Sequence, residues 1–592
     1  MTSEMTRDEL SRAEVAAEKA KAEAAEAAAE AALASEIAEL TREAAALPTA
    51  QKRLDLLIGA TNAEAIVPRL SAEQLFFIIQ GTGLSDALEL VHLCSPDQFK
   101  SFIDLDAWDR DELSPAKVIT WLRAAGTDAD EERFERKLQA LDIELVERVL
   151  QSSVRIWDLE ETPDPEPAGE VFRSPEGKYL LAFLVEGVEL SGLKRLVSAL
   201  YARDPLQAAR LIEAVRWELS AELTESAYRW RTARLSDLGF PDLEEALSYF
   251  AFIDPNAALA ASPLPSPLGA IFAMSPDRHE RRFWERALSR VDPAALGAIE
   301  GQTIALLNAV LVVDGVDPAN TEAVEAALSR ARDTLSLGLE QASGGDPEVG
   351  ARLLATVPLK RLFQIGVSLA LRLKFRLDRL ARRTPLFMPG SREPILDAPY
   401  GQLMSALRRK RPLFIDWRED VDLDAPNCPP RAFRDLGDIA RAEAWIAETE
   451  HLVELMAALG LDLDELGRRF VEAGIEEEGL FARHSTLYLT AIAREVTGLG
   501  FSFAPLPRDS VGDFGAAAFE RLPNGHVALR PGFVELLAGK LRRRAVDFSP
   551  AHVETAARYS ERLTHKLMAD LAEPWALGTL DELLALPILV TR

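Results

Sequence analysis

Residues 229–247, RWRTARLSDLGFPDLEEAL, are the first place in this chain to look for chemistry. Three arginines stand close together, with a tryptophan among them and an aspartate just after them. Guanidinium groups that converge on one point bind carboxylates and phosphates, often through two parallel hydrogen bonds. We therefore take as candidate binding residues Trp230, Arg231, Arg234 and Asp237.

The same stretch also has the pattern of a junction between two packed helices, and we favour that interpretation. Arg234 and Asp237 are spaced to pair with each other on one helix, and Trp230 would bury its ring while Arg231 points elsewhere. Gly239 and the Phe-Pro-Asp after it then form a turn into the next helix. In this interpretation the arginines need not converge.

An acidic loop at residues 416–431, DWREDVDLDAPNCPPR, has the beginning of a calcium-binding pattern. Asp420, Asp422 and Asp424 stand where the first three ligands of a calcium loop would stand. The turn glycine is replaced by Ala425, and the bidentate glutamate at the twelfth position is replaced by Arg431. We therefore expect a solvated loop and no metal site.

His484 and Ser485 form the best nucleophile-like pair in the chain. They are neighbours and would point apart on a helix, and no Gly-x-Ser-x-Gly elbow is present, so Ser485 is better explained as a helix N-cap. The seven histidines include no pair at three- or four-residue spacing, so the zinc-enzyme motifs are missing. The glycine-rich nucleotide-binding loops are missing as well, and we expect no cofactor.

The composition is that of a folded, acidic protein. The 592 residues carry a formal net charge of −28 and are 48% hydrophobic. The electrostatic field of this negative charge repels the phosphates of nucleic acids, so we expect no nucleic-acid partner. No run of about 18 uncharged apolar residues predicts a membrane span. Cys94 and Cys428 are too few for a disulfide framework, and the N-terminus has no secretory pattern, so we expect a cytoplasmic protein.

The elements around these candidates have the signals of short helices joined by tight corners. Serines that would cap a helix by accepting from its first N–H groups recur early in the chain, at Ser71, Ser85, Ser95 and Ser114. A second signal is a glycine followed by an apolar residue and then a polar or proline helix start. Glycine in the left-handed conformation ends a helix, and the next apolar residue folds back on its last turn. This pattern occurs at Gly83, Gly187, Gly239, Gly315, Gly460 and Gly474.

These signals predict an all-α protein of stacked helical hairpins, an α-solenoid-like array with at most a minor strand element. Residues 178–187 could form either a strand or a helix. We expect an Ala/Glu-rich helical tail at 1–47 and helical domains at 48–158, 178–253, 278–384 and 396–592, separated by proline-rich breaks. The last part of the tail has coiled-coil spacing that would allow self-association, at Leu33, Ile37, Leu40, Ala44 and Leu47. Alanine fills most of the earlier apolar positions and buries little area, so we favour a solvated helix or a frayed tail.

Three stretches resemble an uncharacterised bacterial family that is catalogued as a domain of unknown function. They are residues 84–113, 228–247 and 396–414, and the resemblance covers about 48–590 without the tail. It implies no activity and no catalytic residues. More loosely, residues 65–125 are similar to the helical arrays of magnesium-transporter cytosolic domains and of flagellar motor-switch proteins, a likeness of pattern that does not establish function.

The function expected from the sequence is that of a protein-interaction or scaffold protein, because helical arrays present extended surfaces and no catalytic motif is present. A protein partner is then expected. The alternative is an enzyme whose site is assembled from residues distant in sequence, around Arg231, Arg234, Asp416 and His484. The sequence does not identify the partner or the reaction.

Overall fold

The computed structural model describes residues 27–44, 47, 49–109, 111–256, 282–384, 386–391, 393–417, 429–580 and 588–591. The structure is 67% helical, and its few strands are short and antiparallel, so the all-α expectation is confirmed. The solenoid-like arrangement stays a prediction. By its internal contacts the chain divides into two compact units. Unit 1 is Met1–Ala251, Ala258–Leu335 and Asp346–Phe363, and unit 2 is Phe252–Ala257, Ser336–Gly345 and Gln364–Arg592. The five segments expected from the sequence stay a prediction.

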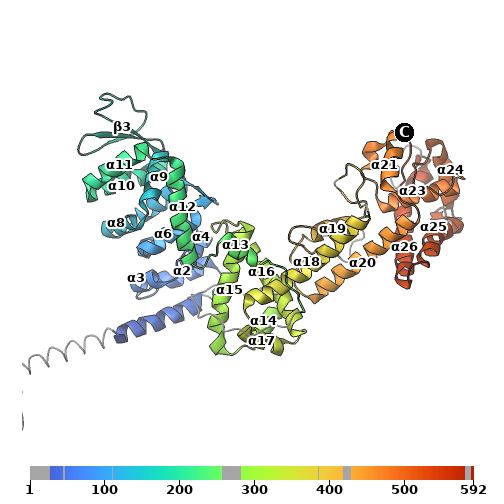
Figure 1. Cartoon of the computed structure of the whole chain (residues 1–592), viewed down its shortest axis with the longest axis horizontal. Coiled ribbons are helices and arrows are strands. Elements are labelled where there is room, and N and C mark those ends of the chain that lie inside the picture. The colour runs from blue at the N-terminus through green and yellow to red at the C-terminus, as the bar shows by residue number, and fades with distance from the viewer. Residues whose placement is uncertain are drawn as a thin grey trace, which may run out of the picture. The chain divides into compact units, whose positions relative to one another are not determined.

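Unit 1 begins with helices that pack against one another in chain order (Figure 1). α2 packs against α4, α4 against α6, and α6 against α8. Three further helices, α7, α11 and α12, pack against α9. Their bounds are α2 (Ala50–Ile58), α3 (Ala63–Ile66), α4 (Ala72–Thr82), α5 (Leu88–Leu93), α6 (Pro96–Asp106), α7 (Pro115–Ala125), α8 (Glu131–Ala140), α9 (Ile143–Ser153), α10 (Gly187–Arg203), α11 (Pro205–Trp217) and α12 (Ser220–Asp237). An aromatic cluster lies at the core of this region, with Phe76, Phe99 and Phe102 around the buried ring of Trp121.

The rest of unit 1 contains α13 (Leu243–Ser248), α14 (Phe283–Leu288), α15 (Pro293–Asp314) and α17 (Pro347–Thr356). Two longer helices, α16 (Thr321–Ser343) and α18 (Leu359–Arg383), contribute residues to both units. Among the described residues α15 is long and apolar enough to cross a membrane, by length and composition alone, with a mean hydropathy of 1.7 in its most apolar window. This is weak evidence, because core helices of soluble proteins also have such a composition.

Unit 2 is built on α19 (Tyr400–Leu407), α20 (Leu436–Ala458), α21 (Leu463–Glu472), α22 (Glu476–Gly479), α23 (His484–Val496), α24 (Val511–Ala518), α25 (Pro531–Ala545) and α26 (Pro550–Leu577). α26 packs along α25 and α20, and α23 packs against α24 and α25. Its core includes Leu487 and Leu537, and the phenol of Tyr488, buried with them, donates to the Leu537 carbonyl at 2.7 Å. These contacts hold α20, α23 and α26 in fixed places around the site described below.

The strands are minor, as expected. β1 (Trp108–Asp109) pairs with β2 (Glu112–Leu113), and β6 (Phe519–Arg521) pairs with β7 (Val527–Leu529). A three-stranded antiparallel sheet has the order β3 (Val154–Asp158), β5 (Tyr179–Phe183), β4 (Val171–Arg173). The ambiguous residues 178–187 therefore contain strand β5.

The glycine corners adopt the conformation that the sequence predicts. All six glycines have positive φ, from 62° at Gly187 and Gly315 to 102° at Gly83. At Gly239 the next residue, Phe240, donates its N–H back to the Leu235 carbonyl at 2.8 Å, which closes the end of α12. Gly187 is the exception to the pattern, because it follows strand β5 and opens α10 instead of ending a helix.

The serine caps are only partly as predicted. Ser71 and Ser95 accept from the third residue of α4 and α6, and Ser95 completes a capping box with Gln98. Ser114 stands at the N-cap of α7 without a side-chain cap bond. Ser85 is not a cap, because a backbone turn that hydrogen-bonds to Gly83 carries the chain two residues further before α5 begins.

Residues 27–44 of the expected tail are helical. The side chains of Leu33, Ile37, Leu40 and Ala44 are half-buried along one face of this helix. Self-association through this face stays a prediction, and the part of the predicted tail before residue 27 lies outside the described residues.

Candidate ligand-binding site

Arg231 and Arg234, which the sequence singles out, both lie on α12 and both contact Asp104 at the end of α6. Arg234 donates from Nε and Nη2 to the two carboxylate oxygens of Asp104, at 2.6 and 2.9 Å, and pairs with Asp142 at 2.7 Å. Arg231 donates to the Asp104 carbonyl at 2.8 Å. Both guanidinium groups therefore bind a residue of the chain itself, Arg234 its carboxylate and Arg231 its backbone carbonyl, which matches the helix-junction interpretation.

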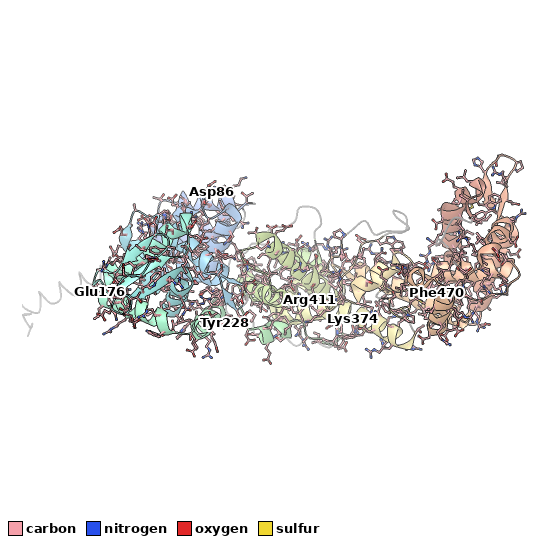
Figure 2. The ribbon with its side chains drawn as sticks, turned by 90° about the horizontal axis from the view of Figure 1, so that it is seen from above. Asp86, Glu176, Tyr228, Lys374, Arg411 and Phe470 are labelled. Carbon is pink, nitrogen blue, oxygen red and sulfur yellow. The ribbon has the colours of Figure 1, made fainter. Side chains whose placement is uncertain are left out.

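Two details of that interpretation are wrong. The ring of Trp230 is not buried but 55% exposed, because the next residue, Arg231, is the one that faces inward. The guanidinium of Arg231 lies over the ring of Trp108. The Trp108 ring also contacts the ring of Tyr228, which is labelled in Figure 2. Arg234 does not pair with Asp237, which is exposed, because the buried Asp104 offers it a two-point contact.

The remaining residues of the enzyme alternative belong to unit 2. Asp416 accepts from Arg441 at 2.5 Å, so its nearest partner is structural. The calcium-like aspartates at 420, 422 and 424 lie outside the described residues. Within the described residues no group of three or more acidic, histidine or cysteine side chains is placed to hold a metal ion.

His484 and Ser485 open helix α23, and Ser485 lines a cavity. Ser485 is not an N-cap, because the helix begins one residue earlier and Arg483 holds that position. His484 is 1% exposed, and burial lowers its pKa to about 4. The imidazole is therefore neutral at pH 7 and a weak base, which does not suit a general base.

The cavity has a volume of about 660 Å³ and lies within unit 2. That volume is in the range of small-molecule sites. Its lining comes from the segment before α19 and from α20, α23 and α26, and includes Leu396, Asp397, Tyr400, Glu448, Leu452, Phe481, Ser485, Arg558, Tyr559, Arg562, Leu563, Lys566 and Ala569. Most of these residues belong to elements that are far apart in sequence, so the cavity exists only in the folded unit.

Asp397 joins three of the cavity walls. Its carboxylate accepts from the backbone N–H of Ser485, at 3.0 and 3.2 Å, and from the Tyr559 hydroxyl at 2.6 Å. A carboxylate at this position is favoured by the partial positive charge of the first turn of α23. Burial, followed by the charge of Asp397, raises the pKa of Tyr559 well above its ordinary value, so the phenol is a fixed donor at neutral pH.

Arg562 forms the second polar group of the cavity. Its guanidinium donates to the Tyr400 hydroxyl at 3.1 Å and forms an ion pair with Glu448. It also lies over the Tyr400 ring, 5.1 Å from its centroid. Arg558, one turn earlier on α26, contacts the other oxygen of Glu448 at 3.5 Å. One carboxylate thus faces two guanidinium groups.

Of the lining of this cavity, sequence reasoning singled out only Ser485. The available signal was the spacing of Arg558, Arg562 and Lys566, four residues apart, which places three cations on one face of a helix. That pattern is common on solvated helices, so it becomes informative only when a cavity lies over it. Tyr400, Glu448 and Asp397 have no local pattern that distinguishes them.

The comparisons with known proteins give the family of the chain. Residues 28–586 match a family of unknown function, DUF6178. The match begins earlier than the expected residue 48 and so includes part of the Ala/Glu-rich segment. The comparison with curated proteins and the comparison with solved structures found no match. Since the match spans nearly the whole chain, the protein belongs to the DUF6178 family.

Proposed function

We propose that this protein is a binding protein, and that unit 2 holds a small organic ligand in the cavity bounded by α20, α23 and α26. The observation that carries the proposal is the Asp397 network, in which a carboxylate, a helix N–H and a buried phenol fix three walls around about 660 Å³. A cavity whose polar groups are held in place before the ligand arrives loses little entropy on binding.

The test is to purify the full chain from its native host and measure its mass under native conditions. A bound small molecule is expected with the wild-type chain. Ala569→Trp, which places an indole in the cavity, should abolish the adduct. Ala557→Trp is the matched control, because Ala557 is exposed on the same helix and is not part of the cavity lining, so the adduct should remain.

The outcome that contradicts the proposal is also defined. If neither a co-purified adduct nor a saturable shift in melting temperature appears across a panel of small anionic, cationic and neutral compounds, unit 2 does not bind a small ligand there. An adduct that persists unchanged in Ala569→Trp places the ligand somewhere else and equally refutes the cavity.

A second candidate function, the interaction protein expected from the sequence, is supported by large exposed apolar side chains in unit 1. Trp217 is 68% exposed, Leu219 64% and Trp230 55%. Tryptophan is enriched among the residues that dominate binding energy at protein interfaces. A photo-crosslinking residue at position 217 should capture one protein partner reproducibly in cells, and Trp230→Ser should weaken that capture. Crosslinking spread over many proteins without preference would contradict this function.

A further inference from the structure

Resting on the cavity proposed above, we infer that its ligand is an organic anion with an apolar body, whose carboxylate or phosphate group binds Arg558 and Arg562. The inference starts from the charges of the lining. Arg562 and Arg558 share the single carboxylate of Glu448, whose side chain is 14% exposed. Together the three groups carry one net positive charge, and the carboxylate of Glu554, which also contacts Arg558 at 3.7 Å, is 71% exposed, so solvent screens it.

The other charges of the lining have partners of their own. Lys566 pairs with Asp570 at 3.3 Å, and Arg483 pairs with Glu393. Asp397 accepts from α23 and Tyr559, as described above. Glu561 is exposed, so solvent screens its charge. Arg558 and Arg562, which share one carboxylate, are therefore the cations of the lining that keep the most charge for an anionic ligand.

The two arginines differ in how firmly they are held. The side chain of Arg562 is 23% exposed and is fixed by Glu448, the Tyr400 hydroxyl and the Tyr400 ring. Arg558 is 49% exposed and makes only longer contacts, with Glu448 at 3.5 Å and with Glu554 at 3.7 Å. The oxyanion of a ligand can therefore replace Glu448 and Glu554 as the partner of Arg558 at little cost, while Arg562 provides a donor that is already held in place.

The rest of the wall is suited to an apolar body. Leu396, Leu452 and Leu563 are buried residues that line the cavity. Phe481 also lines it and is 68% exposed, so its ring has a large apolar surface in contact with water. An apolar group of the ligand that covers this ring would remove that surface from water, which favours binding.

The experiment uses the full chain and four probes that share a ten-carbon tail, below the concentrations at which they aggregate: undecanoate, decyl phosphate, decanol and decyltrimethylammonium. Titration calorimetry should show binding of one or both anions, at least tenfold tighter than of the alcohol and the cation. Whether the carboxylate or the phosphate binds more tightly identifies which oxyanion the site takes.

Variants of Arg558 separate charge from structure. Arg558→Gln should weaken anion binding at least tenfold, and Arg558→Lys should retain part of the affinity because it keeps the charge. Arg468→Gln is the control, since Arg468 is 73% exposed on α21 and pairs with Glu465, and anion affinity should not change.

Three results overturn the inference. If the alcohol or the cation binds as tightly as the anions, the cavity is a ligand site without anion selectivity, and the proposed function survives alone. If a native ligand is found in the cavity but none of the four probes binds, the chemical class is wrong. If no ligand of any charge binds, the proposed function has failed as well.

Discussion

Arg234 donates to both carboxylate oxygens of Asp104, a residue that is only 1% exposed. The guanidinium is therefore the main group that compensates the buried negative charge of Asp104. Burial raises the pKa of Asp104, and the hydrogen bond from Arg234 opposes that rise. Removing one partner of a buried ion pair costs about 3–5 kcal/mol, because the other charge stays buried without compensation.

We therefore expect Arg234→Ala to lower the free energy of unfolding of unit 1 by about 3 kcal/mol or more. Arg229→Ala is the matched control on the same helix, since Arg229 is 76% exposed and pairs with Glu225, and it should cost less than about 1 kcal/mol. Urea denaturation of both variants is the measurement. Equal losses in the two variants would mean that the Asp104 pair is not the main support of this junction.

A second residue, Glu147 on α9, makes the stability of unit 1 depend on pH. Glu147 is only 6% exposed. Burial, followed by the negative charges of Glu218 and Glu144, raises the pKa of its carboxyl group from 4.5 to about 7. The folded state therefore binds a proton more tightly than the unfolded state. Its contribution to stability is complete below pH 4.5 and is lost as the pH rises through 7.

We expect Glu147→Gln to stabilise unit 1 at pH 8 by up to about 3 kcal/mol and to have little effect at pH 4.5. Melting temperatures across this pH range provide the test. Glu225→Gln, at a carboxylate that is 65% exposed, should leave the pH profile unchanged. A wild-type profile in Glu147→Gln would show that this carboxyl group titrates normally in the folded chain.

At the scale of single residues, the sequence predicts which side chains are special better than it predicts their partners. The arginines of α12 are involved in a charged junction, as the pattern indicates. Their partner Asp104 lies 130 residues earlier than Arg234, and no local spacing points to it. For the same reason the sequence predicts that Trp230 is buried and Arg231 is not, whereas in the structure Arg231 faces inward and Trp230 is exposed. Which face of α12 is buried depends on where α6 lies.

At the scale of elements, the corners follow from local chemistry. Gly239 has a φ of 84°, a conformation that costs a residue with a branched side chain about 1–3 kcal/mol. The left-handed glycine and the bond from Phe240 need only neighbouring residues, which is why the sequence predicts them. Gly187 has the same conformation at the end of a strand, so the pattern identifies a corner but not the element before it.

We expect Gly239→Val to destabilise unit 1 by about 1–3 kcal/mol. The control is Gly512→Val in α24, where an added Cβ meets no atom within 4 Å and φ is not positive, so stability should change by less than about 0.5 kcal/mol. The measurement is the melting temperature of each variant relative to the wild type. Should Gly239→Val melt with the wild type, the corner does not depend on glycine.

At the scale of the whole molecule, the chain forms two compact units, and each contains buried apolar residues. The all-α class could be predicted, since caps and corners recur along the chain. The cavity could not, because the packing of α20 and α26 brings Glu448 to Arg562 and Asp397 reaches Tyr559 from the segment before α19, and both depend on the complete unit. The pairing of buried charges across distant helices is a property of the fold and not of any short stretch.

Two units with separate cores should unfold in two calorimetric transitions. A ligand in the cavity stabilises only the unit that contains it, by about 2.7 kcal/mol at a concentration one hundred times its Kd. We expect undecanoate or decyl phosphate to raise one transition, and Arg234→Ala to lower the other. A single transition that both changes shift together would refute this independence.

The hydrogen bond between Tyr559 and Asp397 spans 162 residues of sequence. A ribosome adds about 5–20 residues per second, so roughly 10–30 s separate the synthesis of these two side chains. During that interval the nascent chain already contains Asp397 and, for part of it, α23, but has no wall from α26. The cavity is therefore closed late in translation, and a ligand present in the cell can bind only to a chain that has been synthesised past α26.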